Sequence, residues 1–204
     1  INIHNSSLLG ANNLLQAGSV DVYGNKFGKA GTGSTILRGA HNLTYNVLMR
    51  TGNNKFIGNA QWETFATNPG GLTFQHNWYG PDTCLQNLNF VLKGNSALLT
   101  NSGGNNYVAG DLIIDGQGAM KYIEFTGGTG NSFNVAGSFT VKNLTPYPET
   151  GVGLSNIYLR NLNVAGTDTC GTFYCYTGDI NNCSFNGNFK IVGDSSQTYH
   201  LYNS

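Results

Sequence analysis

Carboxylates are the first residues to consider, because acids held in pairs, roughly 5 to 9 Å apart, carry out much of the known chemistry on polysaccharides. The seven Asp and three Glu of this chain are scattered along it, and no two are adjacent. Asp111 and Asp115 flank one expected strand and would lie at its two ends, where turn and cap roles are usual. We therefore expect no catalytic residue and no enzymatic activity.

Metal ligands are the next possibility. The histidines His4, His41, His76 and His200 are isolated, and the cysteines form no Cys-x-x-Cys pair of the kind that binds zinc. The segment Gly127–Phe133 resembles the start of a calcium-binding nonapeptide repeat, but Ser132 replaces the ligand Asp and the phrase occurs once. We expect neither a metal site nor a cofactor.

The cysteines have a second possible use, in disulfides. Cys84 is alone, whereas Cys170, Cys175 and Cys183 fall within about one expected coil. We predict that at least one pair among these three is oxidised, as is usual for extracytoplasmic proteins. Four cysteines allow three connectivities, among which the sequence does not choose. Buried free thiols are the alternative.

A ligand contact is predicted where the segment after Gln75 ends in turn residues and presents aromatic side chains. The candidate contact residues are His76, Trp78 and Tyr79. The alternative is that Trp78 and Tyr79 only pack over the edge of a coil.

Composition narrows the possible partners. The chain has 204 residues, enough for one domain, and 10% of them are charged, against roughly 25% in ordinary globular proteins. Its net charge is zero and it has three Arg, which argues against binding nucleic acid or an anionic lipid surface. No stretch approaches the roughly 20 apolar residues of a transmembrane helix. Because the chain begins with Ile1, we expect a fragment of a longer secreted or surface protein.

A recurring phrase indicates the elements that must position any site. An Asn-rich lead-in, a small turn with Gly and alternating apolar residues appear at 105–114, 131–141 and 182–191, with a looser copy at 161–164. Steps of about 25 residues indicate a repeat architecture, and the alternation indicates strands. We predict an all-β fold, a single parallel β-helix (β-solenoid) spanning residues 1–204 with coils of roughly 25 residues. Its core would hold one ladder of Leu112, Phe139, Val164 and Phe189; a β-sandwich is the alternative.

The N-terminal part of the chain follows the same pattern less regularly. Strands are expected near Gly18–Val22 and within 41–47, 58–65 and 71–74. The Gly-rich stretch Gly24–Ser34 predicts a surface loop or an irregular end of the stack. Two prolines in Thr145–Glu149 predict a protruding loop.

The phrase Gly130–Leu144 resembles the repeats of bacterial autotransporter passengers, especially the vacuolating-cytotoxin-like ones. This resemblance implies a right-handed β-helix, exported through the outer membrane and displayed or released extracellularly as an adhesin or virulence factor. Its partners would be a host-cell receptor, a glycan or further copies of itself. The cysteines and the absence of a translocator barrel from this chain depart from the family pattern, and no catalytic residues carry over.

The sequence thus predicts a non-enzymatic secreted or cell-surface module for adhesion, colonisation or host-cell interaction. One alternative is a self-assembling extracellular filament subunit, a β-sandwich in which Ile1–Leu15 is donated to a neighbour. The other is a polysaccharide-acting β-helix enzyme or phage tailspike.

Overall fold

The structure is a computed structural model in which every regular element is a β-strand. It describes residues 1–18, 20–31, 33–39, 48–64, 73–76, 81–92, 97–100, 104–117, 122–125, 132–143, 155–168, 170, 172–193 and 199–202. For parts of several strands only the backbone is described. These residues contain no helix, and hence none long and apolar enough to cross a membrane.

The strands form three parallel sheets, which we call A, B and C. Sheet A contains β1 (Asn2–His4), β4 (Val20–Tyr23), β7 (Leu48–Gly52), β10 (Thr73–His76), β13 (Ala97–Thr100), β16 (Tyr122–Phe125), β19 (Ser155–Arg160), β21 (Thr172–Asn181), β23 (Lys190–Gly193) and β24 (Tyr199–Tyr202). Sheet B contains β2 (Ser7–Leu8), β5 (Lys26–Phe27), β8 (Lys55–Phe56), β11 (Thr83–Cys84), β14 (Asn106–Val108), β17 (Phe133–Val135), β20 (Leu162–Val164) and β22 (Ser184–Phe185). Sheet C contains β3 (Asn13–Ala17), β6 (Ser34–Gly39), β9 (Asn59–Thr64), β12 (Leu88–Val91), β15 (Leu112–Asp115) and β18 (Phe139–Lys142).

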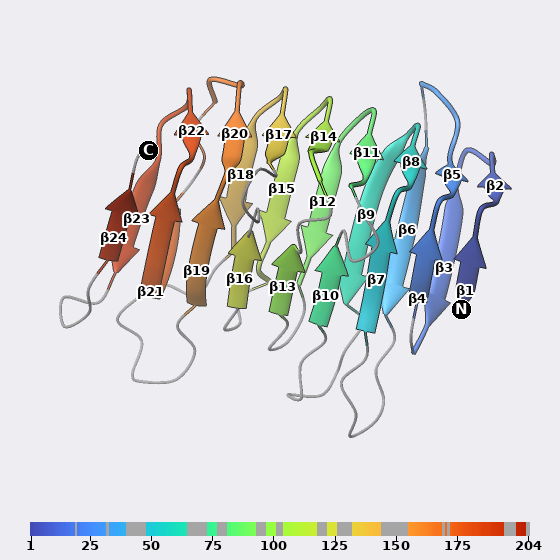
Figure 1. Cartoon of the computed structure of the whole chain (residues 1–204), viewed down its shortest axis with the longest axis horizontal. Coiled ribbons are helices and arrows are strands. Elements are labelled where there is room, and N and C mark those ends of the chain that lie inside the picture. Colours follow the sequence, from blue (N-terminus) through green and yellow to red (C-terminus); the bar gives the residue numbers. More distant parts are fainter. Residues whose placement is uncertain are drawn as a thin grey trace.

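From β1 to β18, successive strands pass from sheet A to B to C and then back to A, one coil further along, while β19 to β24 belong to sheets A and B (Figure 1). Each strand therefore pairs in parallel with its equivalent in the next coil, as β12 does with both β9 and β15. The stack runs from the N-terminal end at the right of the figure to the C-terminal end at the left. The predicted β-solenoid is confirmed, and the β-sandwich alternative is wrong.

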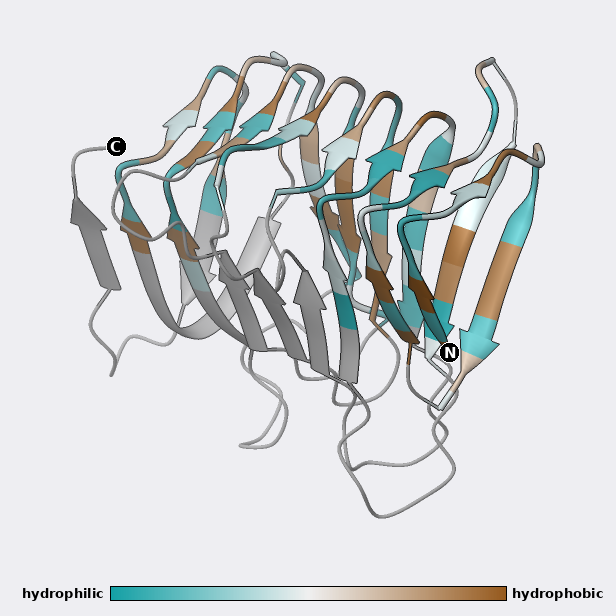
Figure 2. Cartoon of the chain, turned by 45° about the vertical axis from the view of Figure 1, so that its right-hand side comes forward, coloured by the Kyte–Doolittle hydropathy of each residue, from teal (hydrophilic) through white to brown (hydrophobic). Residues whose placement is uncertain are grey.

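In the strands whose side chains are described, alternate residues point into the coil, so hydrophobic and hydrophilic residues alternate along them (Figure 2). The interior contains a run of large aromatic side chains. Phe27 stacks on Phe56 with ring centroids 5.1 Å apart, Phe56 contacts Trp62 at 5.1 Å, and Trp62 contacts Phe90 at 5.5 Å. All four are buried. A single coil has no neighbour on which to bury such apolar residues. Contacts between coils therefore stabilise the stack.

The predicted apolar ladder is half right. Leu112 and Phe139 pair in register in sheet C, but Val164 lies in sheet B, in register with Val135. Phe189 packs instead on Phe185, with ring centroids 4.8 Å apart. The error came from assuming a constant coil length, because hydrogen-bonded equivalent residues are separated by 24 residues in one pair of coils and 29 in another.

Two expectations for the N-terminal third are also corrected. The stretch Gly24–Ser34 is not wholly loop, because it contains β5 and the fully buried Phe27. Gly24 forms a corner of the coil with a φ of 67°, where Asn5 and Asn53 of the two neighbouring coils have φ of 51° and 54°. The segment Ile1–Leu15 is not a free donated strand, since β1 and β2 pair with β4 and β5 of the next coil.

The corner from sheet B to sheet C explains the recurring Val-Ala-Gly phrase. Gly110, Gly137 and Gly166 stack on one another, with backbone hydrogen bonds of 3.1 Å from Gly137 N to Gly110 O and 2.9 Å from Gly166 N to Gly137 O. A Cβ on Gly137 would lie 2.5 Å from the Gly110 carbonyl oxygen. Only Gly allows the backbones of successive coils to approach so closely at this corner.

Candidate functional site: a polar row and groove on sheet B

Buried asparagine and aspartate side chains position the residues of sheet B. Asn25, Asn54, Asp82 and Asn106 occupy the same place in successive coils, with exposed fractions of 3%, 2%, 1% and 4%. Asn25 Nδ2 donates to Asn54 Oδ1 (3.1 Å), and Asn54 Nδ2 donates to Asp82 Oδ1 (3.0 Å). Backbone amides join the ladder, since Asp82 N donates to Asn106 Oδ1 (2.8 Å). The ladder provides acceptors for buried backbone amides at this corner and thereby fixes the starts of β5, β8, β11 and β14.

The residue after each ladder member points out of the coil, and the one after that points in. In β8, for example, Lys55 is exposed while Phe56 is buried. In-register pairing aligns these outward residues along the solenoid axis. We call this alignment the sheet B row; it consists of Ser7, Lys26, Lys55, Thr83, Tyr107, Asn134, Asn163 and Ser184.

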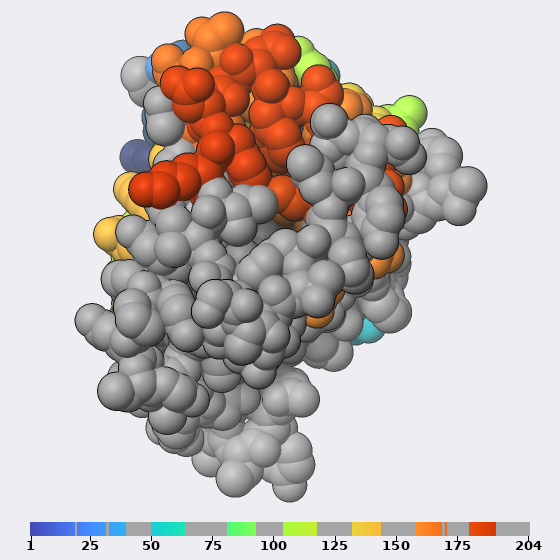
Figure 3. All heavy atoms as spheres, turned by 90° about the vertical axis from the view of Figure 1, so that its left-hand side faces the viewer, coloured from blue at the N-terminus to red at the C-terminus, as the bar shows by residue number. Residues whose placement is uncertain are grey.

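The C-terminal half of this row forms one wall of a groove of about 470 Å³. The groove is lined by Tyr107, Asn134, Val135, Ala136, Asn163, Val164, Ala165, Ser184 and Asn186. Its small residues Ala136 and Ala165 belong to the Val-Ala-Gly phrase, and both are exposed. In the space-filling view from the C-terminal end, the described residues of the last coils lie at the top, where Figure 1 places β20 and β22 (Figure 3).

Asparagine amides in the groove are held in fixed orientations. Asn134 Nδ2 donates to Ser132 Oγ (2.7 Å) and to Asn106 O (3.3 Å), which leaves its Oδ1 to accept from Asn163 Nδ2 (3.1 Å). Asn186 Nδ2 donates to Ala165 O (3.1 Å) on the other side of the groove. Because both amide hydrogens of Asn134 are used, this residue can only accept from a ligand hydroxyl, whereas Asn163 and Asn186 each have a second N–H to donate.

Tyr107 adds an aromatic surface to these amides. Its exposed fraction is 42%, high for a large hydrophobic residue, and it follows the buried Asn106 directly. A ring beside fixed amides suits a ligand with an apolar face and hydroxyl groups at its edges. The described lining residues include no carboxylate, histidine or cysteine, and they offer a ring surface, small apolar groups and hydrogen-bonding amides.

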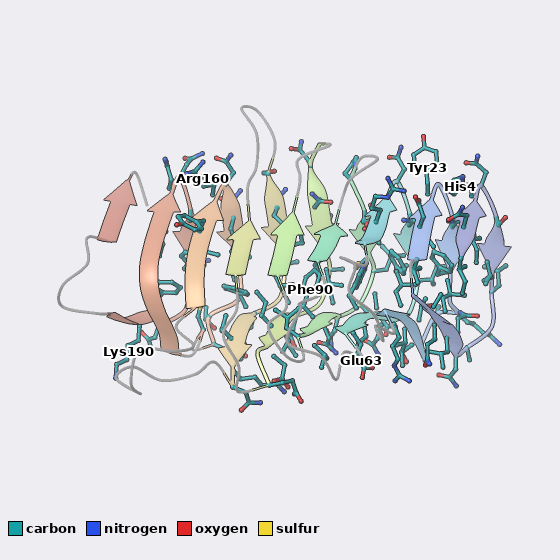
Figure 4. All side chains as sticks on the ribbon, turned by 90° about the horizontal axis from the view of Figure 1, so that it is seen from below. His4, Tyr23, Glu63, Phe90, Arg160 and Lys190 are labelled. Atoms are coloured by element: carbon teal, nitrogen blue, oxygen red, sulfur yellow. The ribbon has the colours of Figure 1, made fainter. Side chains whose placement is uncertain are left out.

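The outer faces of sheets A and C carry charged residues in a different arrangement. On sheet A, Arg50 Nη2 lies 2.6 Å from Asp21 Oδ2, and His4 Nε2 lies 3.5 Å from Asp21 Oδ1. On sheet C, Arg38 Nη2 lies 2.9 Å from Glu63 Oε2. Figure 4 shows His4 and Glu63 on opposite sides of the solenoid. Both faces therefore pair opposite charges between neighbouring coils.

The predicted ligand contacts are not brought together by the described residues. His76 ends β10, where its backbone pairs in register with Thr100, and its side chain is not described. Trp78 and Tyr79 lie outside the described residues. Sequence reasoning missed the sheet B row, although a signal was present: the tripeptide Asn-Lys-Phe occurs at 25–27 and again at 54–56.

The predicted disulfide among Cys170, Cys175 and Cys183 is not found, because every such pair would include Cys170 or Cys183, and neither of these is in a disulfide. Cys84, Cys170 and Cys183 are buried free thiols, and the side chain of Cys175 is not described. Burial raises the pKa of the Cys84 thiol well above its ordinary value, and the nearby Asp82 carboxylate raises this pKa further. Burial also raises the pKa of Cys170. Both thiols are therefore held in the protonated, unreactive form.

Asp111 and Asp115 have structural contacts. Asp111 Oδ1 accepts a hydrogen bond from Ser138 N (2.9 Å) in the next coil. Burial alone would raise the pKa of Asp115, but hydrogen bonds from Asn143 and Gln117 and the Lys142 ammonium outweigh burial and lower this pKa. The described residues contain no cluster of His, Cys, Asp and Glu able to hold a metal ion.

Comparison of the chain with protein-family models, with curated proteins and with solved structures finds no match.

Proposed function

We propose that this chain is a non-enzymatic binding module that holds a glycan along the outer face of sheet B. The observation that carries this proposal is the groove, in which the exposed Tyr107 ring stands beside the oriented amides of Asn134 and Asn163. A sugar ring presents C–H groups to an aromatic face and hydroxyls to amides, so it matches both features.

The solenoid also explains why an extended ligand fits. The groove crosses β14, β17, β20 and β22, whose spacing of about 4.8 Å gives it a length of roughly 15 Å along the axis. Its polar groups recur once per coil, because Asn134 and Asn163 pair in register. A linear oligosaccharide, in which similar groups also recur at regular intervals, can contact several coils at once.

The proposed setting is extracellular or at a bacterial cell surface, in an adhesin-like passenger that contacts a host cell. Support comes from the resemblance of Gly130–Leu144 to autotransporter repeats and from the fold that this resemblance implies. Weak contacts repeated along a rigid surface gain strength when several are made together, which suits attachment to surfaces that carry many glycans.

A glycan array tests this function. We expect the wild-type chain to bind a subset of linear oligosaccharides, and Tyr107→Ala and Asn163→Ala each to weaken that binding about tenfold or more, about 1.4 kcal/mol. Tyr23→Ala is the matched control, because Tyr23 lies at the end of β4 on the outside of sheet A. Binding to no glycan, or equal loss with Tyr107→Ala and Tyr23→Ala at unchanged stability, would contradict the proposal.

A further inference from the structure

Two lysines extend the sheet B row beyond the groove. Lys26 in β5 and Lys55 in β8 pair in register and are both exposed. Neither forms an ion pair with a residue that the structure describes. Like charges directly opposite on neighbouring strands repel each other, so this arrangement lowers stability rather than raising it.

Neighbouring coils elsewhere in the molecule avoid such repulsion. Asp21 pairs in register with Arg50 on sheet A, and Arg38 with Glu63 on sheet C. Near the other end of sheet C, Lys142 Nζ lies 3.6 Å from Asp115 Oδ2. The chain as a whole is neutral, so the two stacked lysines do not simply follow from an excess of basic residues.

The lysines and the groove belong to one continuous surface. The row passes from Lys55 through Thr83 to Tyr107 by in-register pairing of β8, β11 and β14. Two strand spacings separate Lys55 from Tyr107, or about 10 Å along the axis. The buried ladder fixes the register here, since Asn54 N donates to Asp82 Oδ1 (2.8 Å) and Asp82 N donates to Asn106 Oδ1 (2.8 Å).

We infer that the ligand of the sheet B row is an acidic oligosaccharide, which carries a carboxylate or sulfate group near one end. Its neutral sugars would occupy the groove, and its anionic group would lie between Lys26 and Lys55, relieving their mutual repulsion. This inference rests on the proposed glycan binding. A nucleic acid fits less well, because its charges continue along the whole backbone and the described groove residues include no cation.

The test uses an array in which each acidic linear oligosaccharide, carboxylated or sulfated, is accompanied by its neutral counterpart. The best pair is then titrated by calorimetry against the wild-type chain and Lys26→Gln/Lys55→Gln. We expect the wild-type chain to bind the acidic member about tenfold more tightly, a preference sized for two exposed charge contacts. The double variant should lose this preference, and so should the wild-type chain at high salt.

Lys142→Gln is the matched control, because it removes a lysine from sheet C and should leave the preference unchanged. Equal binding of acidic and neutral members by the wild-type chain would overturn the inference, as would a preference that survives in the double variant. In either case, neutral binding that depends on Tyr107 would leave the proposed function standing. Binding to neither member would overturn both. Carboxylated and sulfated probes distinguish which acidic group is bound.

Discussion

The outer face of sheet B differs from the outer faces of sheets A and C in how charges meet between coils. On sheets A and C, basic residues lie beside acids of a neighbouring coil, and the carboxylate of Glu63 is largely buried there. On sheet B, Lys26 lies against Lys55, and beyond Tyr107 the row is uncharged.

This difference indicates which faces stabilise the fold and which face is free to bind a ligand. Opposite charges in register stabilise the stack of coils, while stacked like charges and an exposed aromatic ring contribute little to it. In-register pairing repeats a stabilising contact on sheets A and C, and on sheet B it repeats the groups that we propose to bind the ligand. We therefore propose that sheets A and C have structural roles and that sheet B has the binding role.

The largest expected effect is a difference in thiol reactivity between the outer and inner sides of a single sheet B strand. Thr83 belongs to the outer row, while the adjacent Cys84 is buried and its thiol pKa is raised. A cysteine introduced as Thr83→Cys should react with an alkylating reagent at the rate of an exposed thiol, whereas Cys84 should react roughly a thousandfold more slowly, through opening of the coil. Peptide mass spectrometry of the time course resolves the two sites. Equal rates would mean that the register of β11 is wrong.

The next largest effect is expected from a substitution that breaks the buried Asn/Asp ladder beneath the sheet B row. Asn54→Ala removes the acceptor of Asn25 N and the donor to Val22 O, leaving buried polar groups without partners. We expect the free energy of unfolding to fall by about 3 kcal/mol. The neighbouring substitution Lys55→Ala should change it by less than about 0.5 kcal/mol or raise it slightly. Urea unfolding of both variants checks this contrast; comparable losses would contradict it.

A smaller effect is expected from a charge pair on sheet C. Arg38→Ala removes two hydrogen bonds to Glu63 Oε2, at 3.1 and 2.9 Å, and leaves Gln61 Nε2 as a donor to that oxygen at 3.3 Å. Because the carboxylate stays buried, the free energy of unfolding should fall by about 2 kcal/mol. Binding of glycan should not change, as the calorimetric titration can show. A loss of affinity at full stability would place the ligand on sheet C instead.

The smallest effect depends on pH. The pKa of Asp115 is lowered in the folded chain, so its charged form contributes stability that is present above the unfolded pKa of about 3.9 and is lost as the pH falls through the folded pKa. Asp115→Asn should therefore be slightly less stable than the wild-type chain at pH 6. The difference should disappear in strong acid. Urea midpoints across this pH range provide the test, and a difference that grew on acidification would contradict it.

The solenoid itself could be predicted because strand alternation and corner residues are local signals. Leu112 and Ile114 alternate with outward residues, and Gly110 marks a corner that only Gly allows. Coil length is not a local signal, because the connections from sheet C to sheet A differ in length from coil to coil. A constant step along the sequence therefore places Val164 in the ladder of sheet C, whereas it lies in sheet B.

The groove was harder to predict, for the same reason. Tyr107 and Asn163 are far apart in sequence and lie in one row only because the registers of three strands bring them into line. The aromatic pair Trp78 and Tyr79 is more conspicuous in the sequence, but it lies outside the described residues. The repeated Asn-Lys-Phe tripeptide is the useful signal for the sheet B row, because in it a buried Asn is followed directly by a residue that points outward.

The most direct test of the account is to map the ligand by NMR, following backbone and asparagine side-chain amide shifts during titration with the best oligosaccharide from the array. We expect the largest shifts at Tyr107, Asn134, Asn163 and Ser184, with smaller ones at Lys26 and Lys55. Shifts concentrated around Asp21 and Arg50 on sheet A, or around Arg38 and Glu63 on sheet C, would contradict it.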